Sequence, residues 1–259
     1  MVFDTRGRRK HVIRVVYAIL ALLMGASLFL VVGPVNIGAL IGNSSSSNPG
    51  KVLDEQAART ERKLAIEPNN EDLLVSLMRT RVAASSAKTE VNSETGLPEY
   101  TPESQRELLG ASTAWRRYSK VAKEVNPSAA ALMAGAFFSL AEAAGSLEEA
   151  DASVEEAAAA QRIAAEARPS VGALSNLAIY EYYSGDYAAG DKAAKQAAAA
   201  VPKAEAKEVK KQMAEYRARG KALEKQKAEI AKLEKGQRKE ALENPFGGLG
   251  GSTTGSLGG

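Results

Sequence analysis

The chain has 259 residues, with 34 Lys and Arg against 31 Asp and Glu, one His and no Cys. The lack of cysteine excludes disulfides, thiolate nucleophiles and cysteine-based metal sites. The single histidine, His11, excludes a multi-histidine metal site and an ordinary Ser-His-Asp triad. We therefore expect a protein that is not an enzyme and has no catalytic, cofactor-binding or metal-binding residues.

The net charge of +3 is the sum of separate blocks. Residues 1–14 carry five basic residues and one acidic residue, which gives +4, and residues 15–50 carry no charge. Residues 51–202 hold 16 basic and 22 acidic residues, which gives −6, and residues 203–243 hold 13 and 8, which gives +5. A nucleic-acid interface would combine basic residues with aromatic ones. The late basic block has one aromatic residue, Tyr216, so we expect no nucleic-acid partner.

Residues 15–35 form an uncharged run, VVYAILALLMGASLFLVVGPV. Its 21 residues, as a helix, would span about 30 Å, the thickness of the hydrocarbon core of a bilayer. Because an isolated span must bond its own backbone groups, this run predicts a transmembrane helix, with residues 15–42 covering the span and its exit. The lipid bilayer is therefore an expected partner of residues 15–35.

The main alternative is a cleavable signal peptide, whose apolar core would be shorter and would end at a small-x-small site. The retained anchor is favoured here. Arg8-Arg9 gives weaker support to a twin-arginine signal, because Lys10 and His11 follow it. The basic cap, residues 1–14, predicts a cytoplasmic N-terminus and a single-pass protein of the cell membrane, with its C-terminal domain outside the cytoplasm.

The segment NSSSSNPG, residues 43–50, has the composition of a flexible linker. Beyond it no strand pattern is present, and Ala, Glu, Lys, Leu and Arg, all good helix formers, dominate. Prolines follow apolar-periodic segments and mark helix ends. These prolines are Pro68, Pro127, Pro169 and Pro202.

The spacing of 33 residues between the last two of these prolines is close to the period of a tetratricopeptide repeat (TPR). The stretch NLAIYEYYSGDYAAGDKAAKQAAAAVP, residues 176–202, resembles such a repeat. The matching positions are Leu177 and Ala178 in the first helix, Gly185-Asp186-Tyr187 at the turn, and Ala197 and Pro202. Glu181, at the usual tyrosine position, and Gly190, at the middle alanine, depart from the pattern.

Two weaker units precede this one, and we expect three degenerate repeats over residues 51–202 after a first helix at 52–66. The second helix of the first unit is expected at 101–125, after an insertion at 85–100, and that of the second unit at 149–167. The sequence thus predicts an all-α protein. An N-terminal transmembrane helix is followed by a TPR-like right-handed helical-hairpin array and a long C-terminal capping helix. A generic alanine-rich bundle is the alternative.

The TPR family holds peptides or partner proteins on the concave surface of its first helices. Carrying that surface over by position implies a partner-binding site of mixed apolar, aromatic and charged residues. The implied residues are Val75, Arg79, Phe138, Glu142, Asn176, Ile179, Tyr182 and Tyr183. The loop with Pro98 and Tyr100 is a second candidate surface.

Residues 203–243 predict one long charged helix with a heptad seam that includes Val209, Tyr216 and Leu223. We expect its first half to cover the last repeat and its second half to be solvated; self-association through 203–243 is the alternative. The Gly-rich tail, residues 244–259, is expected to be disordered.

We therefore expect a membrane-anchored scaffold or adaptor that binds a peptide or protein partner of unknown identity. A membrane anchor joined to an external TPR-like domain is also similar to translocon-associated factors of the bacterial envelope. A chaperone-like accessory factor at the export machinery and a homo-oligomeric structural membrane protein are thus the alternatives.

Overall fold

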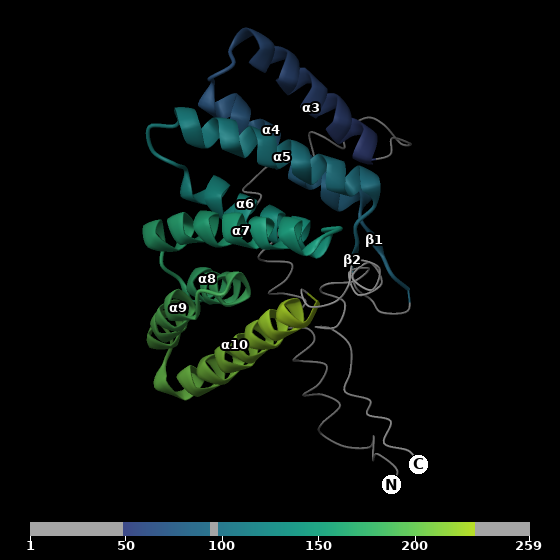
Figure 1. The fold of residues 1–259 in the computed structure, drawn as a ribbon. Coiled ribbons are helices and arrows are strands. Elements are labelled where there is room, and N and C mark those ends of the chain that lie inside the picture. The colour runs from purple at the N-terminus through teal and green to yellow at the C-terminus, as the bar shows by residue number, and fades with distance from the viewer. Residues whose placement is uncertain (1–48, 94–97, 231–259) are drawn as a thin grey trace, which may run out of the picture. The chain divides into compact units, whose positions relative to one another are not determined.

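A computed structural model describes residues 49–93 and 98–230 (Figure 1). This part of the chain is helical apart from one small hairpin, so the predicted all-α class is confirmed for it. The elements are α3 (Pro49–Ile66), α4 (Glu71–Lys88), β1 (Glu90–Val91), β2 (Pro98–Glu99), α5 (Pro102–Val121), α6 (Pro127–Glu142), α7 (Leu147–Ala167), α8 (Val171–Ser184), α9 (Tyr187–Ala199) and α10 (Lys203–Ile230).

The six helices from α4 to α9 each begin with a side chain that accepts a hydrogen bond from a main-chain N–H of the first turn. Such capping satisfies a donor that has no partner within the helix, and each cap is worth about 1 kcal/mol. The caps explain why the helices start where they do. The capping residues are Asn70, Thr101, Asn126, Ser146, Ser170 and Asp186.

Consecutive helices pack as pairs, α4 with α5, α6 with α7, and α8 with α9. Each pair also contacts the next through α5 with α6 and α7 with α8, while α3 packs on α4 at the beginning of the stack. At the other end α10 packs on both α8 and α9 (Figure 1). The predicted order, one helix, three hairpins and a final long helix, therefore matches the described residues.

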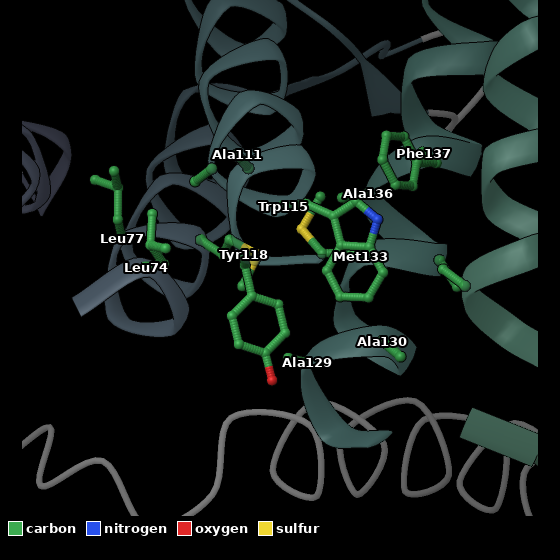
Figure 2. Close-up of a cluster of buried hydrophobic side chains, with 14 of the residues drawn as sticks. Leu74, Leu77, Ala111, Trp115, Tyr118, Ala129, Ala130, Met133, Ala136 and Phe137 are labelled. Carbon is green, nitrogen blue, oxygen red and sulfur yellow. The ribbon is translucent and has the colours of Figure 1, made fainter. Parts of the chain in front are cut away.

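The largest apolar cluster extends from α3 to α7, and Figure 2 shows residues of it from α4, α5 and α6. Trp115 and Tyr118 of α5 contribute its largest rings, with centroids 5.9 Å apart, and Met133 and Phe137 of α6 pack against this cluster. The Tyr118 hydroxyl accepts a hydrogen bond of 2.8 Å from the main-chain N–H of Asn126, the residue that caps α6. The cluster therefore joins the first hairpin to the second.

Alanines fill most of the remaining interior, especially along α6 and α7. Small side chains allow helix axes to approach closely, so the alanine content has a packing explanation. On α4 the large apolar side chains Leu74, Leu77 and Met78 are buried.

Several boundaries differ from the expected ones. Helix α3 begins at Pro49, inside the predicted linker, because proline is tolerated in the first turn of a helix. The expected helix at 101–125 ends at Val121. The prediction of no strand was wrong, since Glu90–Val91 pairs antiparallel with Pro98–Glu99 within the expected insertion. These strands are too short to show an alternating pattern.

The described part of α10 covers more of the array than expected. Met213 packs with the α8–α9 residues, and Leu223, 1% exposed, packs with Ala141 and Val154 of the second hairpin. Lys227 pairs with Asp151 of α7. The predicted heptad seam is thus used within the molecule through residue 227.

Within residues 49–93 and 98–230, no helix has the length and apolar content needed to cross a bilayer. The basic cap 1–14, the expected span 15–35, its exit segment, most of the linker, residues 231–243 and the tail 244–259 lie outside the described residues.

Candidate functional site

A row of aromatic side chains lies across α6, α8 and α10. Phe138 stacks on Tyr180 at 4.9 Å and on Tyr183 at 5.9 Å between ring centroids. Tyr183 in turn meets the edge of Tyr216 at 6.5 Å. Phe138, Tyr180 and Tyr216 are partly exposed, so this row reaches the protein surface. We call Tyr100, Phe138, Tyr180, Tyr183 and Tyr216 the aromatic surface.

Tyr100 joins this surface from the end of the hairpin. Its hydroxyl donates a hydrogen bond of 3.0 Å to Oε2 of Glu142, the last residue of α6. Glu142 is exposed and lies one turn beyond Phe138 on the same face of α6, because residues four apart are neighbours on a helix. The surface therefore combines ring edges, phenol hydroxyls and one carboxylate.

The pKa values of these groups are shifted by their surroundings. Burial raises the pKa of Tyr180 to about 12, and the negative charge of Glu142 adds to the effect. Burial likewise raises the pKa of Tyr100 to about 12. Glu142 keeps exposed surface, but partial loss of water around its carboxyl raises its pKa, and the hydrogen bond from Tyr100 opposes that change. The neutral phenol forms are thus favoured beside a carboxylate in a partly apolar site.

Four of the residues that the TPR resemblance implied lie on or beside this surface. Phe138 is part of it, Glu142 accepts the hydrogen bond of Tyr100 beside it, and Ile179 packs against the same small cluster as Phe138. Tyr183 belongs to the row but is 8% exposed, so it supports the other rings more than it faces solvent.

Tyr182, also on the expected list, is 2% exposed and lies in the core between α8, α9 and α10. Its hydroxyl donates to Asp191 at 3.0 Å. Of the remaining three expected residues, Asn176 lies one turn before Tyr180 on α8, and Val75 packs against the same apolar cluster as Phe138. Val75 is half-buried on α4, while Arg79 and Asn176 are exposed on α4 and α8. The structure thus places four of the eight expected residues on or beside the aromatic surface and buries Tyr182 away from it.

Tyr180 and Tyr216 were not expected at the site. Tyr180 was not among the residues that the resemblance implied, and Tyr216 was predicted to lie in the heptad seam of the last helix. Tyr100 was assigned to a separate candidate surface, and the structure brings it onto α6. The sequence places Tyr100 in an insertion, but it does not indicate which helix that insertion contacts.

A second polar cluster ties α3, α4 and α5 together. The carboxylate of Glu107, with a side chain 10% exposed, accepts from Arg81 at 2.7 Å and from Lys88 at 2.8 Å. Arg81 also pairs with Glu61, and Lys88 pairs with Asp54 at 2.6 Å. Every charge in this cluster has a partner, so its arrangement is that of a structural network.

A groove of about 570 Å³ lies beside this network, between α3 and α5. Leu64 and Leu77 are among its apolar residues, and Arg81 and Arg117 line it as well. Arg117 donates to the main-chain oxygen of Pro68 at 2.8 Å, so this guanidinium is already engaged. No described part of the chain brings three or more His, Cys, Asp or Glu residues into an arrangement that could hold a metal ion.

Comparison with known proteins found no matching family model, no similar curated protein and no similar solved structure.

Proposed function

We propose that this chain is a membrane-anchored protein–protein interaction module of the tetratricopeptide type, which binds a peptide or protein segment on its aromatic surface. The observation that carries this proposal is the partly exposed stack of Phe138 of α6 on Tyr180 of α8, which Tyr100 joins from the end of the hairpin. Large rigid rings give much contact area at little cost in conformational entropy, and aromatic residues are enriched where proteins bind one another.

The order of the helices supports the repeat assignment. Three helix pairs follow one another, and α6 contacts both helices of the preceding pair. In such an array each pair covers the apolar face of its neighbour, and an extended surface is left for partners. Helix α6 and helix α8 are the first helices of their pairs, which is where this family holds its ligands.

The anchor is part of the same proposal. It rests on the uncharged run at 15–35 and on the +4 charge of residues 1–14, which favours a cytoplasmic N-terminus and an external helical domain. The packing of the heptad seam of α10 on α8 and α9 favours a capping role for that helix over self-association.

Affinity capture with the full chain from detergent-solubilised membranes tests the proposal. The double variant Phe138→Ala with Tyr180→Ala should reduce recovery of the partner at least about tenfold, because central aromatic residues carry most of the energy at interfaces. The control is Leu109→Ala, which changes an exposed apolar residue of α5 outside the aromatic surface. Both variants should keep the helical circular-dichroism signal of the unchanged chain.

A partner that is lost with Leu109→Ala and retained with the double variant would contradict the proposal. That result would move the binding surface to α5.

A further inference from the structure

The carboxylate of Glu142 has no cationic partner among the residues that the structure describes. None of the ion pairs in residues 49–93 and 98–230 includes it, and its one hydrogen bond comes from the neutral hydroxyl of Tyr100. By contrast, Glu181 and Glu107, the buried glutamates nearby in the array, are paired with Arg162 and with Arg81. Within the described residues, Glu142 is thus a negative charge without a compensating cation at the aromatic surface.

The position of Glu142 within α6 strengthens this negative potential. It is the last residue of the helix, and the last turn contains no basic residue. The C-terminal end of a helix carries the negative end of the helix dipole, so a carboxylate there is unfavourable and a cation is favourable. The helix end and the carboxylate therefore both favour a cation at this position.

The adjacent rings add a third attraction for a cation. The faces of Tyr and Phe rings carry partial negative charge and attract ammonium and guanidinium groups. The same array already contains this kind of contact, since the Arg219 guanidinium lies 5.4 Å from the centroid of Tyr216. At the Glu142 side of the surface, Tyr100, Phe138 and Tyr180 supply rings beside the carboxylate, and no described Lys or Arg has a ring contact with these three.

We propose that the partner segment presents a Lys or Arg side chain whose charge pairs with Glu142, while apolar residues on either side of it contact Phe138 and Tyr180. This inference rests on the proposed function and gives the partner its chemistry. The Tyr100 hydroxyl orients the carboxylate by donating to Oε2 and leaves the other oxygen, Oε1, for the incoming donor. Binding forms and breaks no covalent bond. The charged donor of the partner replaces water at Oε1 of Glu142.

The test uses the full chain in lipid nanodiscs and measures fluorescence anisotropy of three short probe peptides. Each has one central residue flanked by Pro and Leu: Lys in the first, acetyl-lysine in the second and Glu in the third. The unchanged chain should bind the Lys peptide about tenfold more tightly than the acetyl-lysine peptide, as a charge-assisted pair beside aromatic rings predicts. The Glu peptide should bind most weakly.

The variant Glu142→Gln should reduce the preference for Lys over acetyl-lysine to less than about threefold, because the amide keeps an oxygen for Tyr100 and loses the charge. The matched control is Glu155→Gln, which removes the same charge from an exposed position on α7. This control should keep the tenfold preference.

Three results would overturn the inference. The first is equal binding of the Lys and acetyl-lysine peptides to the unchanged chain. If Tyr180→Ser then weakened the binding of both peptides, the proposed function would still stand. Lack of binding of any probe at millimolar concentration would also overturn the inference, and the capture experiment would decide the proposed function separately. A gain in affinity for all probes on truncation after residue 230, with no effect of Glu142→Gln, would assign the surface to the chain's own residues 231–259.

Discussion

Gly220 of α10 lies against the main-chain carbonyl of Tyr182 in α8 so closely that a β-carbon at position 220 would be 2.5 Å from that oxygen. The ring of the same tyrosine covers Gly190 of α9, where a β-carbon would be 2.5 Å from two ring carbons. Tyr182 therefore fits between two glycines from the neighbouring helices. This fit fixes the position of α10 and, through Tyr216 and Tyr183, one end of the aromatic surface.

The substitution Gly220→Ala should destabilise the helical domain by about 1–3 kcal/mol, since the new methyl group would meet a main-chain atom that cannot turn away. Urea denaturation followed by circular dichroism measures this loss. Gly135→Ala is the matched control, because it lies inside α6 with open space around it and should gain about 0.5–1 kcal/mol from helix propensity. An alanine at 220 that is tolerated as well as one at 135 would contradict the packing of α10 described above.

Gly185 ends α8 with a φ of 90°, a left-handed conformation that favours glycine. Gly185→Ala should cost about 1 kcal/mol, and Gly185→Asn should cost less, because asparagine tolerates this region better. Thermal melting of the two variants gives the comparison. Equal melting temperatures for the alanine variant and the unchanged chain would show that the turn can adopt another geometry.

Glu107→Gln should destabilise the domain by about 2–4 kcal/mol, because it leaves Arg81 and Lys88 with less compensating charge in a largely buried site. Glu156→Gln breaks a more exposed pair with Arg116 and should cost less than about 1 kcal/mol. Chemical denaturation of both variants at the same salt concentration measures the difference. Similar losses for the two would mean that burial adds nothing to the Glu107 pairs.

Stability should fall between pH 10 and pH 12. Burial raises the pKa of folded Tyr180 to about 12, whereas a tyrosine in an unfolded chain titrates near pH 10. The stabilising contribution is complete below pH 10 and is lost as the pH rises to 12, because the unfolded state releases its proton first. With Tyr180→Phe, the free energy of unfolding should fall less steeply with pH over this range. An unchanged slope would contradict the burial of this hydroxyl.

Much of the helical order could be predicted from the sequence, because proline and capping residues act locally. Pro68, Pro169 and Pro202 each lie in a break between two helices, as predicted, whereas Pro127 begins α6 instead of ending the helix before it. The turn at Gly185-Asp186 was also confirmed, with Gly185 left-handed and Asp186 as the cap of α9. Local chemistry decides each of these features.

The two departures from the repeat pattern have tertiary causes that no local pattern contains. Glu181 is buried at the tyrosine position because Arg162 of α7 pairs with it at 2.5 Å. Gly190 lies where the resemblance to the repeat implied an alanine, and the ring of Tyr182 occupies the space that a β-carbon would need. Tyr182 was expected at a binding surface from its position on the helix, but α9 and α10 enclose it. The position of a residue along the helix predicts the side of α8 on which it lies. It does not predict which neighbouring helix covers that side.

Site-specific photo-crosslinking in native membranes tests most directly whether the aromatic surface binds a partner. A photoreactive phenylalanine derivative is placed at position 180 of the full chain and, as the comparison, at position 155 on the exposed face of α7. The account predicts a discrete crosslinked protein from position 180 that is absent from position 155 and is lost when Phe138→Ala is added. Crosslinks from position 155 alone, or crosslinks from 180 that persist with Phe138→Ala, would contradict it.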